Sequence, residues 1–264
     1  MDAAEPAISG TTDASGPGVI IGAVTPPPLP DGIDPFDLLD TEQERLDRFF
    51  SSLDDAGWQT PTACAGWRRR EMVAHMAGGE LYNRICLDGD LAPLFAEASV
   101  AGATDVDSFN AWQVRIRQGQ SGEAVLDEWR RAAADVRRRL RERGRDGVLI
   151  TMVGPYPVGP QAFHLAFEAG IHGDDMDVPV AAVDRSGRHA WMARFCAWNL
   201  EEEGRPVALT RDAGRTHARH TDDGAEATLD DGTLIAHFAG RRHDPSLRPS
   251  LARALRLYGE SPEA

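Results

Sequence analysis

The chain has 264 residues, of which 42% are hydrophobic, and its 42 acidic and 28 basic residues give a formal net charge of −14. This length accommodates two domains, and the apolar content is sufficient for a hydrophobic core, which excludes a largely disordered chain. The negative charge repels phosphate groups and anionic lipid surfaces, so we expect neither nucleic acid nor a membrane among the partners.

Residues 1–33 are predicted to form a flexible leader. They are rich in Gly, Pro, Ser, Thr and Ala and end in a proline-rich run at residues 26–30. Such a composition buries too little apolar surface to offset the entropy lost on ordering. The one apolar stretch, residues 18–24, is too short to span a membrane and follows no basic region, so we predict no targeting or transmembrane segment.

Residues 34–203 are predicted to form a helical bundle. Helical periodicity begins at Asp34 and Pro35, an N-cap residue followed by proline at the first helical position. Ser121 is a second candidate cap, and residues 153–157 are predicted to form a loop. The predicted helices cover residues 34–57, 67–87, 106–118, 121–143, 160–172 and 187–203.

Residues 204–264 are predicted to form a small α+β domain. Three short runs compatible with β-strands follow Gly204 and are separated by Asp-Gly and Ala-Gly turns. Two short helices follow, near residues 232–240 and 246–258. A mainly helical first domain followed by this smaller one is the predicted organisation.

The three cysteines, Cys64, Cys86 and Cys196, are far apart in the sequence and form no C-x-x-C motif. A small, odd number of cysteines without a secretory signal is typical of a reducing compartment. We therefore expect a cytoplasmic protein. We also expect Cys64 to be buried and unreactive, because no neighbour in the sequence marks it as a thiol of low pKa.

A candidate metal site combines two predicted helices. Glu168 and His172 are spaced i, i+4, which puts both side chains on one helix face. His75 lies on the inward face of another helix, traced in steps of three and four by Met72, Gly79, Tyr82 and Cys86. Two imidazoles and one carboxylate form a ligand set that leaves a fourth zinc position open. Spacing alone leaves open a solvated Glu/His pair and a hydrogen-bonded core histidine.

Four segments carry a resemblance to a known family. Residues 58–67 (WQTPTACAGW) precede the MVAHM sequence of residues 72–76, and EAGIHGDDMDVP occupies residues 168–179. In order, separation and flanks they resemble the mycothiol-dependent maleylpyruvate isomerase family, within the DinB-like metalloenzyme superfamily. Residues 234–241 (LIAHFAGR) resemble the family's closing L-x-G-R helix, in a domain related to sterol-carrier proteins.

The resemblance implies a DinB-like up-down four-helix bundle at residues 34–203. It implies that His75, Glu168 and His172 bind one divalent metal, with zinc favoured, and that mycothiol is the thiol cosubstrate. Mycothiol is the low-molecular-weight thiol of actinobacteria, and the complete absence of lysine is consistent with a GC-rich actinobacterial host. A monomer or weak homo-oligomer is expected.

The resemblance also gives roles to two further residues. Arg241 is expected to approach the site as a catalytic residue that holds a substrate carboxylate, with a surface salt bridge as the rival interpretation. Asp175 either hydrogen-bonds a ligand imidazole or caps the helix end. A polar groove between the two domains, with His164 and Arg241 in its wall, is predicted to reach the metal and to bind mycothiol.

The sequence departs from the family pattern at two positions. His164 stands where members carry arginine, and Asp174 stands where they carry an aromatic residue. His164 shares the face of Glu168 and His172, so it is a candidate fourth ligand, substrate contact or polar neighbour of the ligands. These changes favour a mycothiol S-transferase acting on a small electrophilic or natural-product substrate. A mycothiol-dependent cis–trans isomerase and a metal-stabilised small-molecule-binding or regulatory protein are the alternatives.

Overall fold

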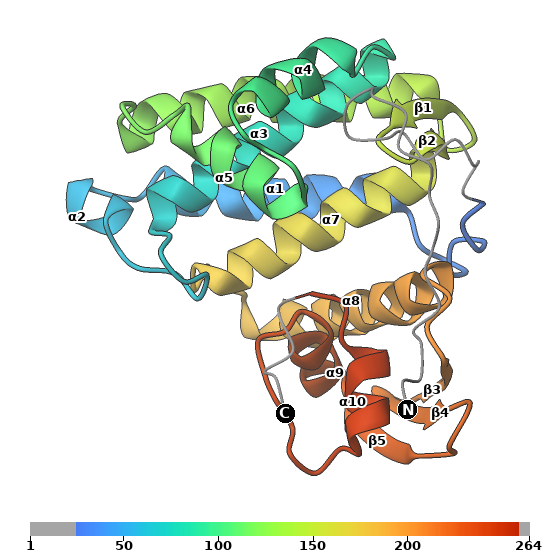
Figure 1. The fold of residues 1–264 in the computed structure, drawn as a ribbon. Coiled ribbons are helices and arrows are strands. Elements are labelled where there is room, and N and C mark those ends of the chain that lie inside the picture. The colour runs from blue at the N-terminus through green and yellow to red at the C-terminus, as the bar shows by residue number, and fades with distance from the viewer. Residues whose placement is uncertain (1–24, 259–264) are drawn as a thin grey trace, which may run out of the picture.

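The computed structural model describes residues 25–258 and is mainly helical (Figure 1). Its largest part is a bundle of four long helices, which are α1 (Pro35–Phe50), α3 (Arg69–Asp88), α6 (Gly122–Arg143) and α7 (Val158–Asp175). A small part containing a sheet follows, so the predicted fold class is confirmed. Within residues 25–258, no helix is long and apolar enough to cross a membrane.

The structure contains both helix N-caps predicted from the sequence, Asp34 and Ser121. The Asp34 side chain accepts hydrogen bonds from the backbone N–H groups of Phe36, at 2.9 Å, and Asp37, at 3.3 Å. Ser121 caps α6 by accepting from the N–H of Ala124 at 3.2 Å. These bonds satisfy N–H groups that have no partner within the first helical turn.

The first predicted helix is shorter than expected. It ends at Phe50 rather than near residue 57, and a separate short helix, α2 (Asp55–Trp58), follows. The Asp54 side chain accepts from the N–H of Gly57 at 2.7 Å, so a new N-cap interrupts the periodicity. The smaller helices α4 (Ala92–Val100) and α5 (Val106–Arg115) lie between α3 and α6 in sequence, and α4 was not predicted.

The predicted loop at residues 153–157 is wrong. Strand β2 (Gly154–Pro157) pairs antiparallel with β1 (Val148–Thr151) to form a hairpin. The turn uses Gly154 at a φ of +96°, a conformation that glycine adopts at little cost. Thr151 reinforces the turn, since its hydroxyl donates to the Gly154 carbonyl at 3.0 Å. The two prolines in β2 favoured a loop prediction, because proline is rare inside sheets. An edge strand, however, tolerates proline.

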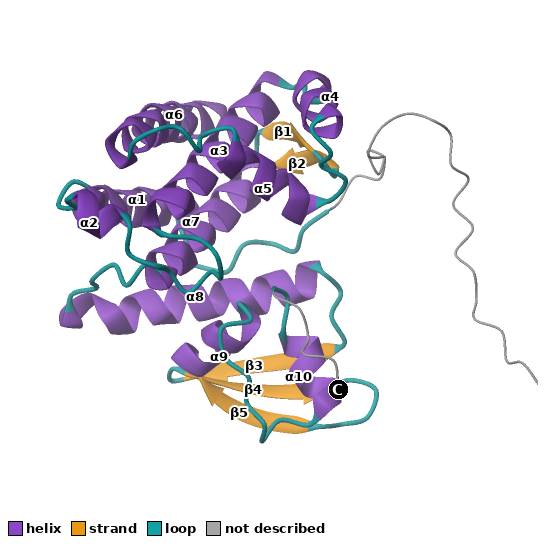
Figure 2. Ribbon diagram, turned by 60° about the vertical axis from the view of Figure 1, so that its left-hand side comes forward, coloured by secondary structure: helices purple, strands orange, loops and turns teal. Residues whose placement is uncertain are grey.

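Helix α8 (Ala182–Glu202) lies between the bundle and the C-terminal sheet (Figure 2). That antiparallel sheet has the order β3-β4-β5, and two short helices complete this part of the chain. The bounds are β3 (Val207–Asp212), β4 (Arg215–His220), β5 (Glu226–Asp230), α9 (Asp231–Phe238) and α10 (Pro249–Leu255). One hydrophobic cluster contains residues of α7, α8 and α9 and so crosses the predicted domain boundary at residues 203–204. That boundary stays a prediction.

Residues 25–33 contact α8 and the core. The indole N–H of Trp198 donates to the Pro27 carbonyl at 3.0 Å, and Ile33 is 7% exposed within the main hydrophobic cluster. Leu29 packs against the same cluster. Apolar anchors at the end of the proline-rich run therefore hold this stretch against the body of the protein. The rest of the predicted leader, residues 1–24, lies outside the described residues.

Candidate metal centre

His75 lies on the inward face of α3. The helix begins after Arg68, whose N–H donates to the Glu71 carboxylate at 3.0 Å. His75 is 7% exposed, and its ring packs against Trp67 with 5.1 Å between the ring centroids. This packing fixes the imidazole so that its Nε2 atom points towards α7.

Glu168 and His172 meet His75 from the facing helix α7. The two imidazole Nε2 atoms of His75 and His172 are 3.2 Å apart, and His75 Nε2 lies 3.5 Å from Glu168 Oε1. The ligand atoms of the three residues all lie within 4.8 Å of one another. The structure thus brings together the three residues that the sequence singled out. Within residues 25–258, no fourth histidine, cysteine or carboxylate joins this group.

The spacing of these atoms fits a tetrahedral zinc ion. Zinc–nitrogen and zinc–oxygen bonds of about 2.0–2.2 Å at tetrahedral angles separate neighbouring ligand atoms by roughly 3.3–3.6 Å. The two measured distances, 3.2 and 3.5 Å, are close to this separation. Three protein ligands would leave one position for water or a thiol. The donor set and its geometry are therefore compatible with an open, catalytic type of zinc site.

The protonation states also suit a cation. Burial lowers the pKa of His75, which favours the neutral imidazole that can bind a metal. For Glu168, burial raises the pKa, but the hydrogen bond from His75 and the nearby imidazoles of His172 and His164 outweigh it, so the net pKa is lowered. A neutral imidazole and an ionised carboxylate are the forms that metal binding requires.

Asp175 orients His172 from the end of α7. Its Oδ2 atom lies 3.1 Å from His172 Nδ1, leaving Nε2 to face His75. Arg241, which follows α9, binds the same carboxylate through both oxygens, with Nε–Oδ1 at 2.6 Å and Nη2–Oδ2 at 2.7 Å. Burial raises the pKa of Asp175, but the hydrogen bonds from His172 and Arg241 outweigh it and lower the pKa to about 2. A carboxylate that fixes a ligand imidazole is a recurrent feature of metal sites.

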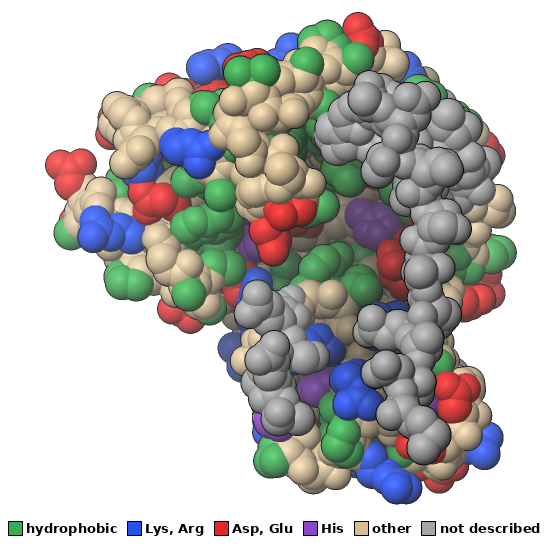
Figure 3. All heavy atoms as spheres, viewed as in Figure 1, with side chains coloured by type: hydrophobic (Ala, Val, Ile, Leu, Met, Phe, Trp, Pro, Cys, Tyr) green, Lys and Arg blue, Asp and Glu red, His purple; other side chains and the backbone are tan. Residues whose placement is uncertain are grey.

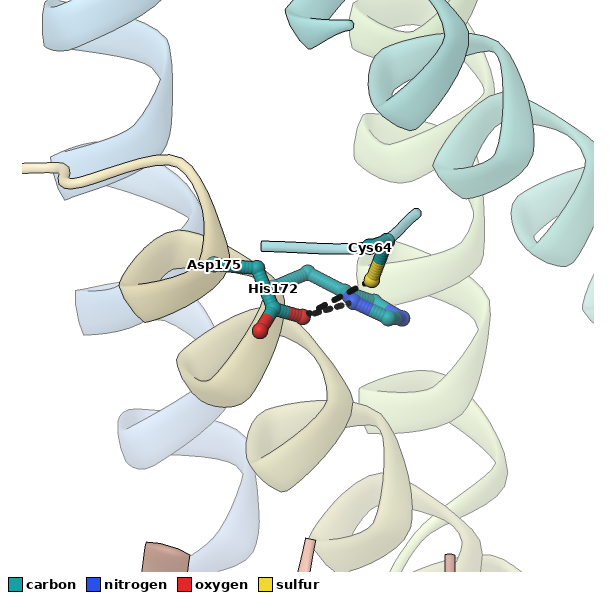
Figure 4. A group of neighbouring side chains, drawn as sticks. All are labelled: Cys64, His172 and Asp175. Carbon is teal, nitrogen blue, oxygen red and sulfur yellow. Dashed lines mark hydrogen bonds and ion pairs between the residues drawn. The ribbon is translucent and has the colours of Figure 1, made fainter. Parts of the chain in front are cut away.

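Cys64 completes the surroundings of this carboxylate. Figure 4 shows the side chains of Cys64, His172 and Asp175 converging, and the thiol donates to Asp175 Oδ2 at 3.3 Å. These three also have ligand atoms within 4.8 Å of one another. However, the guanidinium of Arg241 occupies both oxygens of Asp175 and would repel a cation. Burial and the charge of Asp175 raise the pKa of Cys64 to about 11, so the group acts as a hydrogen-bonded support for His172.

His164 points away from the candidate ligands. Its Nε2 atom lies 2.9 Å from Glu202 Oε2 and 3.2 Å from the Tyr156 hydroxyl, which also donates to Glu202. Burial raises the pKa of Glu202, but the hydrogen bonds from His164 and Tyr156 outweigh it and lower the pKa. His164 is therefore held by hydrogen bonds to Glu202 and Tyr156, one helical turn from Glu168. It lines a cavity of about 490 Å³ together with Tyr156, Glu202 and Glu203.

The second departure from the family pattern does not border the candidate metal site. Asp174 is exposed, and its carboxylate forms an ion pair with Arg188 of α8 at 2.9 Å. Two residues along a helix correspond to a rotation of about 200°, so Asp174 and His172 lie on different faces. Asp174 therefore gives no structural reason to expect a different substrate at the metal site.

The surface is hollowed between the bundle and the C-terminal part, and histidine side chains are visible in the hollow (Figure 3). The Arg241 guanidinium comes from the C-terminal part and reaches Asp175 of the bundle. Because both of its bidentate bonds go to Asp175, its position matches a supporting role better than the predicted grip on a substrate carboxylate. The predicted binding groove with His164 and Arg241 in its wall stays a prediction.

Sequence reasoning missed the groups behind Glu168. Glu80 is 5% exposed and accepts a hydrogen bond from the Gln43 amide at 2.6 Å, in the interior of the bundle. Glu80 lies one turn after Met76 on the inward face of α3, so its position on the apolar stripe was the available signal. An acid on such a stripe is rarely buried without a partner.

Comparisons with known proteins identify a matching family and two similar crystal structures. Residues 39–177 match the model of the mycothiol maleylpyruvate isomerase N-terminal domain. No curated protein matches the sequence. The chain is similar to a crystal structure of a histidine-to-alanine mutant of the mycothiol-dependent maleylpyruvate isomerase, at 18% identity and a TM-score of 0.46. It is also similar to a crystal structure of the mycothiol-dependent maleylpyruvate isomerase, at 19% identity and a TM-score of 0.44. Each similarity covers 63% of this chain and 68% of the other.

The matched segment includes all three candidate ligands and Asp175, and it spans more than half of the chain. The protein therefore belongs to the mycothiol maleylpyruvate isomerase family.

Proposed function

We propose that the chain is a mycothiol-dependent cis–trans isomerase of the maleylpyruvate type. In this proposal His75, Glu168 and His172 hold a divalent cation, with zinc favoured. The observation that carries the proposal is the convergence of three ligand atoms within 4.8 Å, inside the segment that matches the family. That match supports isomerisation better than the S-transfer preferred from the sequence.

The residues around the site would prepare it for a thiol. A bound cation would supply one effect, which is to lower the pKa of a coordinated thiol so that the thiolate forms near neutral pH. Asp175 keeps the His172 imidazole in the tautomer that exposes Nε2, and Arg241 keeps Asp175 ionised and in place. Trp67 packs on His75 and limits its rotation.

The thiolate is both nucleophile and leaving group in an isomerisation. Its sulfur adds to one carbon of a conjugated cis double bond, so a C–S bond forms, the π bond breaks and the electron pair moves towards the conjugated carbonyl oxygen. Rotation follows about the resulting single bond. Return of the electron pair then breaks the C–S bond and restores the double bond in the trans form. The thiol is regenerated, and atoms and charge balance without another reactant.

One observation favours the S-transferase as a second candidate. The cavity beside His164 carries the carboxylates of Glu202 and Glu203, and the one imidazole in its wall is paired with Glu202. If the substrate of the metal site occupies this cavity, its wall would repel an anion such as maleylpyruvate. An uncharged or cationic electrophile would suit it better.

The identity of the product tests the proposal. Zinc-loaded protein would be incubated with maleylpyruvate and one-tenth of an equivalent of mycothiol, with a control that lacks mycothiol. We expect the trans isomer to accumulate over many turnovers per thiol, as followed by chromatography and mass spectrometry. A stable adduct whose formation stops when the thiol is consumed would identify the S-transferase instead. No product with mycothiol would contradict the proposal for this substrate.

A further inference from the structure

A small, partly open cavity lies between the helices of the bundle, with Glu168 in its wall. It has a volume of about 20 Å³ and is lined by residues of all four long helices. The polar residues in its wall are Gln43 of α1, Glu80 of α3, Trp129 of α6 and Glu168 of α7. The rest of the wall is apolar and includes Met76 and Leu165.

Three buried polar atoms of this wall have no hydrogen-bond partner among the described residues. They are the amide oxygen of Gln43, the Oε2 atom of Glu80 and the indole nitrogen of Trp129. The three residues are 3%, 5% and 2% exposed. Leaving even one such atom unpaired is unfavourable, because the group loses its hydrogen bonds to water on burial, so three around one cavity indicate a polar occupant.

The volume and the donor set identify that occupant. A cavity holds a water molecule when it offers about 10–15 Å³ or more and two to four polar partners. A metal cation would be repelled by the indole N–H of Trp129, which is a donor only. The cavity therefore suits one small neutral molecule that both donates and accepts hydrogen bonds.

We propose that this cavity holds one structural water molecule that links Glu80 to Glu168, and that Glu80 is a positioning residue for Glu168. The indole N–H and a protonated Glu80 would donate to the water, which would donate to the Gln43 amide oxygen and the Glu168 carboxylate. All four hydrogen-bonding positions of the water are then used. The inference rests on the proposed function, because it treats Glu168 as a metal ligand.

The charges around Glu80 support a protonated acid. Burial and the negative charge of Glu168 raise the pKa of Glu80 to about 8, although the hydrogen bond from Gln43 and the charge of Arg137 lower it. Arg137 of α6 is the cation that faces this group, and its guanidinium also pairs with Asp40 of α1 at 3.0 Å. At neutral pH the carboxyl group can therefore act as a hydrogen-bond donor.

A crystal structure that resolves ordered water gives the first test. We expect density for a single water molecule among Gln43, Glu80, Trp129 and Glu168. A cavity without density would overturn the proposal. This test does not need metal or mycothiol, so its outcome is independent of the proposed function.

Zinc affinity in two variants of Glu80 tests the positioning role. The isosteric variant Glu80→Gln keeps a donor at the cavity, and we expect its affinity in a competition assay to lie within about threefold of the wild type. Glu80→Leu removes the hydrogen-bond donor. We expect this variant to lose zinc affinity by about 10–100-fold, as for other groups that orient metal ligands. Equal affinity in Glu80→Leu, or an equal loss in both variants, would contradict the role. Wild-type protein that binds no zinc would instead contradict the proposed function.

Thermal unfolding of metal-free protein provides a readout that works even if Glu80→Leu does not fold. Because folding raises the pKa of Glu80 from its ordinary value of 4.5 to about 8, we expect wild-type stability to fall as the pH rises between these values. Glu80→Gln lacks this titration. The difference in Tm between Glu80→Gln and the wild type should therefore increase in favour of the variant by roughly 5–10 °C from pH 5 to pH 8, and stay constant above pH 8. A constant difference across this range would contradict a protonated Glu80.

Discussion

Replacing His172 with alanine is expected to reduce the zinc content of the protein from about one ion per chain to nearly none. His172 supplies one of the three ligand atoms, and its Nε2 lies 3.2 Å from that of His75. The two remaining ligands cannot enclose the ion, so the loss of affinity should exceed the roughly 10–100-fold effect of removing an outer partner. Elemental analysis of protein purified without chelator measures this directly. Nickel or iron in place of zinc would be compatible with the same ligands.

The exposed His217 on β4 offers a matched control, because it lies on the C-terminal sheet. His217→Ala should retain the wild-type metal content. If His172→Ala also retained it in full, His172 would not be a ligand, and the assignment of the site would have to change.

Replacing Arg241 with alanine is expected to weaken both the metal site and the fold. The substitution removes both hydrogen bonds from the guanidinium to Asp175, whose side chain is 2% exposed. Without the guanidinium, the buried Asp175 carboxylate should be protonated more readily and should orient His172 less well. We expect a loss of zinc affinity of about tenfold or more and a loss of roughly 3 kcal/mol in the free energy of unfolding.

The neighbouring exposed residue provides the control, since Arg242→Ala removes the same charge from the same segment. Denaturant titration and zinc competition should distinguish the two variants. Arg241→Lys should recover only part of the loss, because an ammonium cannot form the bidentate pair. Equal behaviour of Arg241→Ala and Arg242→Ala would rule out support of the metal site by Arg241.

The sequence predicted those parts of the site that depend on local geometry. Glu168 and His172 share a face because their spacing is close to one helical turn, whatever surrounds the helix. His75 could be oriented from the apolar stripe of its own helix. The contact between the two helices came from the family resemblance, because no local pattern fixes the distance between residues separated by nearly a hundred positions.

Tertiary contacts decided the features that the sequence left open or misjudged. His164 shares the face of Glu168, yet its imidazole is hydrogen-bonded to Glu202 of α8 and does not join the candidate ligands. The partners of Asp175 include Arg241, which only the packing of the C-terminal part brings near. Glu80 escaped notice because its role depends on Gln43 and Glu168, which lie on two other helices.

Binding of mycothiol to metal-loaded and metal-free protein tests the central claim most directly. In the proposed mechanism the thiol sulfur occupies the position left open by His75, Glu168 and His172. Calorimetric titration should therefore detect binding to the zinc-loaded protein, and affinity at least tenfold lower after removal of the metal by a chelator. Equal affinity in the two forms, or no binding in either, would contradict a thiol-dependent mechanism at this site.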